Sequence, residues 1–126
     1  MYRHYNPNPA GNMVRDCVVR AISKAENQSW LETYWGMCLA GSVVFDMPDG
    51  NTSWGKYLQA LGYRRGTLPN TCPDCYTIQE FCRDHPAGTY VVCTGDHAVC
   101  VKDGDIWDAW DSSQEVAVYY WQKKEV

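Results

Sequence analysis

The order of helix and strand signals along the chain places the strongest constraint on its fold. Four segments with apolar residues at helical spacing lie within residues 17–87, and two of them follow capping-box pairs, Ser29 with Glu32 and Thr77 with Glu80. From residue 88 onward the chain holds short runs rich in β-branched and aromatic residues: TYVVCT, HAVCVK, DIWDAW and EVAVYYW. Helices followed by strands are typical of an α+β domain, because βαβ units would alternate the two.

The segment CVVRAISKAE places its apolar residues on one helical face: Val18, Ala21, Ile22 and Ala25. Asp16 is suited to cap this helix, which puts Cys17 in its first turn, and Arg20 and Lys24 are expected to point outward. The next helix is expected to stop near Gly41. The segment SWGKYLQALG (53–62) is the third expected helix.

One domain is expected over residues 1–126, since this length falls in the usual range of a single core. Its parts are an irregular arm (1–16), a mainly helical part (17–87) and a small antiparallel sheet (88–126). The chain is 45% hydrophobic and 13% aromatic, which excludes the low-hydrophobicity signature of disorder. The aromatic residues are expected in the core and the walls of a cleft: Trp30, Trp35, Trp54, Tyr57, Tyr119, Tyr120 and Trp121.

Charge and cysteine content limit the partners and the compartment. The formal net charge is −4 and the basic residues are scattered, which argues against a nucleic-acid-binding face. The sequence shows no apolar run of membrane-spanning length and no secretory signal. Seven cysteines without such a signal favour reduced thiols in the cytoplasm over a disulfide framework.

Cys17 is the best-placed nucleophile among the cysteines. A helix N-terminus carries partial positive charge and lowers the pKa of a thiol. Cys38 and Cys82 fall inside expected helices, and Cys93 and Cys100 fall inside expected strands, where a free cysteine usually behaves as a small buried hydrophobe. Position alone leaves the same inert role open for Cys17.

A general base for this thiol is expected at His97, which opens a strand, whereas His4 lies in the arm and His85 at a helix end. If Asp103-Gly104 forms a two-residue hairpin turn, Val99 lies opposite Asp108. His97 and Asp108 then share one face as diagonal neighbours, close enough for carboxylate and imidazole to meet.

Two alternatives remain open for this hairpin. A bulged or edge strand would leave Asp108 in water, and Asp111 is the rival carboxylate on the opposite face.

These residues resemble the papain-like cysteine peptidases, in which a Cys at a helix start precedes a His and then an Asn or Asp on successive strands. Asp108-Ala109-Trp110 is similar to the papain element in which a shielding Trp follows the third catalytic residue, and residues 16–22 are similar to the nucleophile helix of ovarian-tumour-type deubiquitinases. The resemblance covers residues 6–25 and 88–121. It implies Cys17 as nucleophile, His97 as base and then acid, and Asp108 as the residue that orients His97.

The same resemblance implies an oxyanion donor ahead of the nucleophile. The papain pattern has Gln six residues before the Cys, but this chain has Gly11 there. Asn12 is the nearest side-chain amide and is the expected donor, beside the backbone N–H of Cys17.

A rival interpretation is a structural zinc site. Cys72 and Cys75 have the CxxC spacing of a zinc knuckle, and Cys82 and His85 could complete four ligands. A redox role for the CxxC pair is disfavoured because no βαβ context surrounds it.

The sequence therefore predicts a papain-like α+β cysteine peptidase or related thiol hydrolase that needs no cofactor and acts on a protein or peptide substrate, without nucleic-acid or membrane partners. Two alternatives are an acyltransferase of transglutaminase type with the same triad and a non-catalytic binding module stabilised by zinc.

Overall fold

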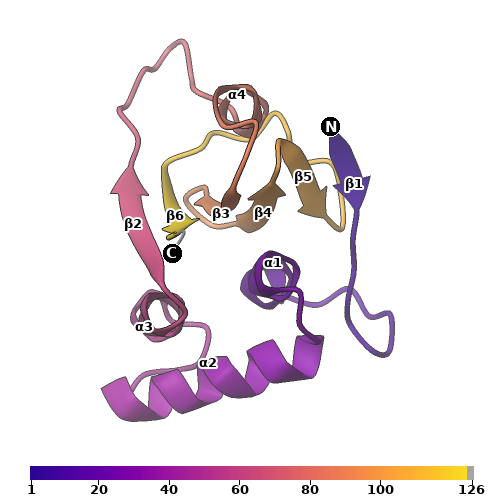
Figure 1. Cartoon of the computed structure of the whole chain (residues 1–126), viewed down its shortest axis with the longest axis vertical. Coiled ribbons are helices and arrows are strands. Elements are labelled where there is room, and N and C mark those ends of the chain that lie inside the picture. The colour runs from indigo at the N-terminus through magenta and orange to yellow at the C-terminus, as the bar shows by residue number, and fades with distance from the viewer. Residues whose placement is uncertain (125–126) are drawn as a thin grey trace.

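A computed structural model describes residues 1–124 of the chain, so the last two residues of the expected sheet segment 88–126 lie outside the described part. It contains four helices and a six-stranded mixed sheet, which confirms the α+β class (Figure 1). The helices are α1 (Cys17–Glu26), α2 (Trp30–Val44), α3 (Asn51–Ala60) and α4 (Ile78–Asp84). The strands are β1 (Tyr2–His4), β2 (Tyr63–Thr67), β3 (Thr89–Cys93), β4 (Ala98–Lys102), β5 (Asp105–Asp108) and β6 (Tyr119–Lys123).

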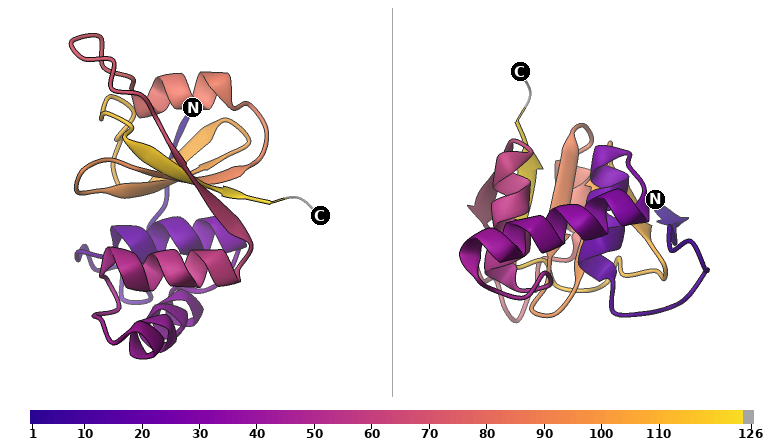
Figure 2. Two further views of the ribbon diagram at one scale, coloured as in Figure 1. Left: turned by 90° about the vertical axis from the view of Figure 1, so that its left-hand side faces the viewer. Right: turned by 90° about the horizontal axis from the view of Figure 1, so that it is seen from below.

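The sheet has the strand order β1-β5-β4-β3-β6-β2, and every neighbouring pair is antiparallel except β1 with β5. Helices α1, α2 and α3 lie on one side of the sheet and α4 lies on the other (Figure 1). Helix α2 is the outermost element on its side and runs across α1 and α3 (Figure 2). The domain is therefore a layered structure in which the central strands are covered on both faces.

Each face of the sheet has its own core. Side chains from α1, α2 and α3 pack against one face, with Ile22, Leu58 and Val91 completely buried among them. On the opposite face α4 contributes Ile78 and Phe81 to a second cluster. The strands β3 and β4 are buried along almost their whole length because both clusters press on them.

The local helix signals are confirmed. Both predicted capping boxes form, with the side chain of Ser29 accepting from the N–H of Glu32 and that of Thr77 from the N–H of Glu80. Helix α1 begins at Cys17 with Asp16 at the N-cap position, although the Asp16 side chain makes no capping hydrogen bond.

Helix α2 continues past Gly41, where a stop was expected, to Val44. A single glycine inside a helix costs only about 1 kcal/mol. At Gly41 the missing side chain makes room for the following loop, because a Cβ atom there would lie 2.7 Å from the carbonyl oxygen of Asp46. Gly41 therefore serves close packing and not helix termination.

Two strands were not predicted, and both lie at sheet edges. Residues 1–16 were expected to be irregular, but Tyr2–His4 pairs in parallel with Ile106–Asp108. Strand β2 contains two arginines and a glycine, a composition typical of an exposed edge strand. The sheet is consequently larger than the small antiparallel sheet expected from residues 88–126, and it is mixed.

Two side-chain placements also differ from expectation. Arg20 was expected to point into solvent but is buried, because two buried carboxylates surround its guanidinium. Trp35 was expected in the core or a cleft wall but is 64% exposed on the outer face of α2. None of the helices in residues 1–124 combines the length and the apolar character needed to cross a bilayer.

Candidate active site

The nucleophile candidate lies where α1 meets the sheet. Cys17 is the first residue of α1, and its thiol is free and partly buried. Backbone N–H groups in the first turn of a helix have no partner within the helix, so they point toward whatever lies at its N-terminus. Cys17 thus lies at the positive end of α1, as predicted.

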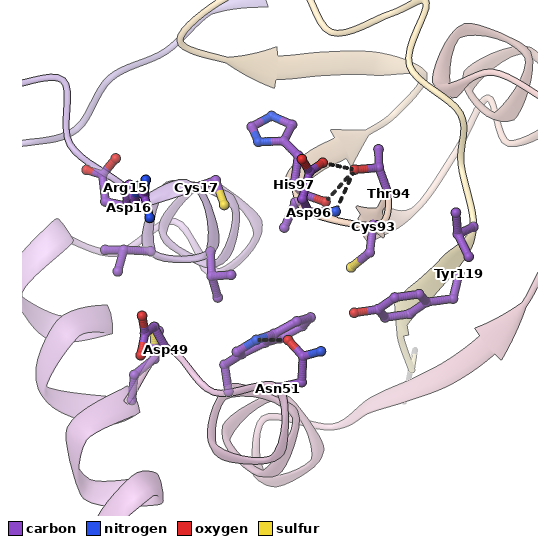
Figure 3. Close-up of a pocket in the computed structure, with 17 residues that line it drawn as sticks. Arg15, Asp16, Cys17, Asp49, Asn51, Cys93, Thr94, Asp96, His97 and Tyr119 are labelled. Carbon is purple, nitrogen blue, oxygen red and sulfur yellow. Dashed lines mark hydrogen bonds between the residues drawn. The ribbon is translucent and has the colours of Figure 1, made fainter. Parts of the chain in front are cut away.

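The thiol faces a cavity of about 280 Å³ between α1, α3 and the sheet (Figure 3). Its polar and titratable lining residues include Arg15, Asp16, Cys17, Asp49, Asn51, Thr94, Asp96, His97 and Tyr119. Because the cavity contains Cys17 and His97 on opposite elements, a molecule bound there would meet both side chains.

The β4–β5 hairpin has the predicted register. Cys100 lies opposite Trp107 and Lys102 opposite Asp105, and the connecting Asp103 and Gly104 both have positive φ, as a tight two-residue turn requires. His97 precedes β4 and Asp108 ends β5. The Nε2 atom of His97 lies 2.6 Å from Oδ2 of Asp108, so the diagonal contact between base and carboxylate is present.

Asp108 is held by more than the histidine. Ser112 Oγ donates to its Oδ2 at 2.7 Å, the N–H of Ala109 donates to its Oδ1 at 2.7 Å, and Arg20 Nη2 donates to the same oxygen at 3.2 Å. The side chain is 1% exposed, which excludes the alternative of a carboxylate left in water on an edge strand. Its orientation is therefore determined by four donors. Asp111, the rival carboxylate, is exposed and accepts from the N–H of Ser113.

Burial of Asp108 would by itself raise its pKa. The hydrogen bonds from His97 and Ser112, the charge of His97 and the N–H of Ala109 outweigh burial and lower the pKa of Asp108 below its ordinary value. The group is accordingly ionised at neutral pH and can stabilise an imidazolium.

A buried ion network joins Asp108 to helix α1. The guanidinium of Arg20 bridges Asp16, one turn earlier on α1, and Asp108. Asp16 also accepts a hydrogen bond from Trp30 Nε1 at 2.9 Å. Arg20 stands 5.3 Å from the ring centroid of Trp110. The helix that carries Cys17 is thus tied to the strand that carries Asp108.

His97 is covered on one side by Trp110, whose ring stacks on the imidazole with centroids 4.5 Å apart. Burial alone would lower the pKa of His97, but the hydrogen bonds to Asp108 and Cys17 and the charges of both groups raise it to about 9. Since Nε2 faces Asp108, Nδ1 is the nitrogen left for the thiol.

The thiol of Cys17 is shifted in the complementary direction. Burial would raise its pKa, but the hydrogen bond with His97, the backbone N–H of Ala98 and the charges of His97 and Arg20 lower it below the ordinary value. Burial instead raises the pKa of Cys82 to about 11 and the pKa of Cys93 and Cys100 to about 12. Cys17 and His97 therefore favour a thiolate–imidazolium pair, whereas these other buried thiols remain protonated.

Asn12 does not join the other site residues. It is exposed in the loop before α1, where its N–H meets Asn8 Oδ1 at 3.4 Å and its carbonyl accepts from Asn6 Nδ2 at 3.3 Å. It is not among the residues that line the cavity. The structure therefore does not support the expected role of Asn12 as an oxyanion donor.

The four expected zinc ligands do not converge in this structure. Cys72 and Cys75 lie on the exposed loop before α4 with their sulfurs 3.0 Å apart. Cys82 is a residue of α4 whose side chain is buried in the core. His85 Nδ1 lies 2.8 Å from the carbonyl oxygen of Phe81. Across residues 1–124 no three His, Cys, Asp or Glu side chains are grouped so that they could hold a metal ion.

Sequence reasoning missed Arg20 and Ser112 as members of the site. The spacing of Asp16 and Arg20, four residues apart, was a usable signal because such pairs face each other on a helix. Nothing local pointed to Asp108 as the second carboxylate partner of Arg20, since it lies far away in the sequence. Ser112 follows the strand in a loop whose return toward Asp108 has no sequence signature.

We compared the chain with protein-family models, with curated proteins and with solved structures, and none of them matches it.

Proposed function

We propose that the protein is a papain-like thiol hydrolase that forms an acyl-enzyme on Cys17, with a peptide or isopeptide as its substrate. The observation that carries the proposal is the chain of contacts from Asp108 to His97 to Cys17, together with the opposite pKa shifts of the thiol and the imidazole. A thiol, a base and an orienting carboxylate in this relation are the minimum set for nucleophilic acyl chemistry.

In the first half-reaction the Cys17 thiolate attacks the substrate carbonyl carbon. The negative charge that develops on the carbonyl oxygen is stabilised by the backbone N–H groups at the start of α1. His97 then gives its Nδ1 proton to the leaving amine as the carbon–nitrogen bond breaks, which leaves a thioester on Cys17 and a neutral imidazole.

In the second half-reaction His97 takes a proton from the acceptor as that molecule attacks the thioester. Water as the acceptor releases a carboxylic acid and restores the ion pair, whereas an amine as the acceptor gives acyl transfer through the same intermediate. Asp108 stays ionised throughout and stabilises the imidazolium each time it forms. Trp110 covers the imidazole and limits its access to water.

The test is site-resolved alkylation with iodoacetamide at about pH 6, below the ordinary thiol pKa of about 8.5. Cys17 should be modified before the other six cysteines. In His97→Ala this selectivity should be lost while the protein stays folded. Uniform labelling, or earlier modification of the exposed Cys72, would refute a thiolate at Cys17.

Acyl-enzyme formation is tested with p-nitrophenyl acetate. The parent protein should release p-nitrophenol in a burst and carry an acetyl group on Cys17 by mass spectrometry, which then disappears by hydrolysis. Cys17→Ser is the matched control, because a serine hydroxyl in the same place is not ionised. A reactive Cys17 that never becomes acylated would leave a binding module and not an enzyme.

A further inference from the structure

The outer face of α2 is apolar and has no cover in the domain. Leu31, Trp35, Leu39 and Val43 follow each other at intervals of four residues and are 50%, 64%, 69% and 62% exposed, respectively. We call these four side chains the α2 ridge. The opposite face of the helix is buried against α1 and α3. Helix α2 is the outermost element on its side of the sheet (Figure 2), and the exposure of the four side chains places the ridge on the solvent side of the helix.

The exposed apolar area is large for a monomer. An aromatic side chain has about 150–250 Å² of surface to bury, so Trp35 and the nearby Phe45, which is 95% exposed, leave on the order of 350 Å² in contact with water. With the rest of the ridge and Met47, the total is on the order of 800 Å², above the usual largest patch of a monomer and close to one partner's share of a standard protein interface.

The charge of the surface indicates what can cover it. Helix α2 contains a single charged residue, Glu32, and no Lys or Arg. An anionic membrane surface attracts helices with basic residues along their polar face, which α2 lacks. The four ridge side chains carry no charge and fit a second apolar surface, while the exposed carboxylates of Glu32 and Asp46 lie toward its two ends.

The spacing of the ridge indicates how a partner would pack. Side chains at intervals of four form the ridges that interdigitate in the commonest class of helix–helix packing. A two-fold axis beside α2 brings the same ridge of a second copy into this position, and a two-fold interface uses the same patch on both chains. Two copies of this patch bury on the order of 1,600 Å², the area of a stable interface.

We propose that the α2 ridge, with Phe45 and Met47 at its end, is the interface of a symmetric homodimer in which α2 packs against α2 of a second copy. The inference does not rest on the proposed acyl chemistry. The cavity beside Cys17 lies between α1, α3 and the sheet, on the inner side of α2 (Figure 3), so both cavities stay open in such a dimer.

The test is the mass of the full chain in solution by light scattering and sedimentation velocity, at up to about 100 µM, which populates a dimer of micromolar affinity. A reducing buffer prevents disulfide links through Cys38, which is partly exposed on α2. We expect twice the chain mass of 14.4 kDa. A monomer over the whole concentration range would overturn the proposal, as would co-sedimentation of that monomer with phosphatidylserine vesicles, which would assign the ridge to a membrane.

The variant Trp35→Glu with Leu39→Glu places charges in the middle of the ridge and should weaken the dimer by at least about 30-fold, as expected at an interface centre. Met13→Glu is the matched control, because Met13 is an exposed apolar residue outside α2 and its replacement should leave the dimer intact. Circular dichroism establishes that each variant is folded. If the double variant stays dimeric, or if Met13→Glu dissociates the dimer equally, the interface lies elsewhere.

Discussion

Arg20 provides the most demanding test of how the site is held together. The variant Arg20→Met keeps a long side chain but lacks the guanidinium. Asp16 and Asp108, which are only 5% and 1% exposed, then lose the cation that they share. Taking one partner out of a buried ion pair costs about 3–5 kcal/mol, because the remaining charge has lost its compensation. Since domains of this size are stable by only about 5–15 kcal/mol, we expect this loss to be visible without ambiguity.

The assay is urea unfolding followed by circular dichroism. At pH 7 we expect the free energy of unfolding of Arg20→Met to fall by about 3–5 kcal/mol. Without the guanidinium the pKa of Asp108 rises in the folded state, so the variant takes up a proton earlier as the pH falls. Its deficit relative to the parent should therefore shrink from pH 7 toward pH 4.

Two variants bracket this result. Arg64→Met removes an exposed arginine of β2 and should change stability by less than about 0.5 kcal/mol. Arg20→Lys keeps the charge but loses the planar fork that reaches both carboxylates, so its loss should lie between those of the other two variants. A loss under about 1 kcal/mol in Arg20→Met, or a deficit independent of pH, would refute the argument that the guanidinium compensates two buried charges.

Three further outcomes are expected. At pH 6, Asp108→Asn should retain part of the rapid alkylation of Cys17, and Asp108→Ala should lose most of it. Asp111→Ala should behave like the parent. Loss of Cys17 alkylation in Asp111→Ala but not in Asp108→Ala would contradict the role given to Asp108. Because the pKa of His97 is raised to about 9, its stabilising contribution is complete below pH 6.5 and is lost as the pH rises through 9. Over this range the unfolding free energy of the parent should fall by about 3 kcal/mol more than that of His97→Gln, and parallel curves would count against the ion pair. Replacing Cys72 and Cys75 together by Ser should leave the melting temperature and its response to a chelator unchanged, because their loop is exposed; a large destabilisation would show that the pair has a structural role.

Features that depend on local sequence were predictable. The capping boxes at Ser29 and Thr77 involve residues three apart, and the Asp103-Gly104 turn alone determines which residues of β4 and β5 lie opposite each other. This register is enough to bring His97 and Asp108 together on one face of the hairpin. The start of α1 at Cys17 follows from the same kind of short-range pattern.

Features that depend on distant partners were not predictable. The helical pattern of α1 assigns Arg20 to the solvent side, but the carboxylate of Asp108, brought in by the sheet, joins that of Asp16 in compensating its buried charge. Strands β1 and β2 have few β-branched or apolar residues, and they form because the edges of the sheet offer them unpaired hydrogen-bonding groups. The CxxC spacing suggested zinc, but the core packing of α4 buries Cys82 away from the exposed loop.

The pairing of β1 with β5 determines when the site can assemble. Tyr2 lies opposite Ile106, and the N–H of Tyr5 donates to the carbonyl oxygen of Asp108 at 2.7 Å, so the carboxylate strand is completed by one of the first segments of the chain. Contacts between residues so far apart in sequence form slowly, because a long loop must close first. On the ribosome Cys17 emerges well before His97 and Asp108, and until they arrive its thiol has neither base nor counter-charge. The nascent chain therefore carries an ordinary thiol, and the paired thiolate appears only when the sheet closes.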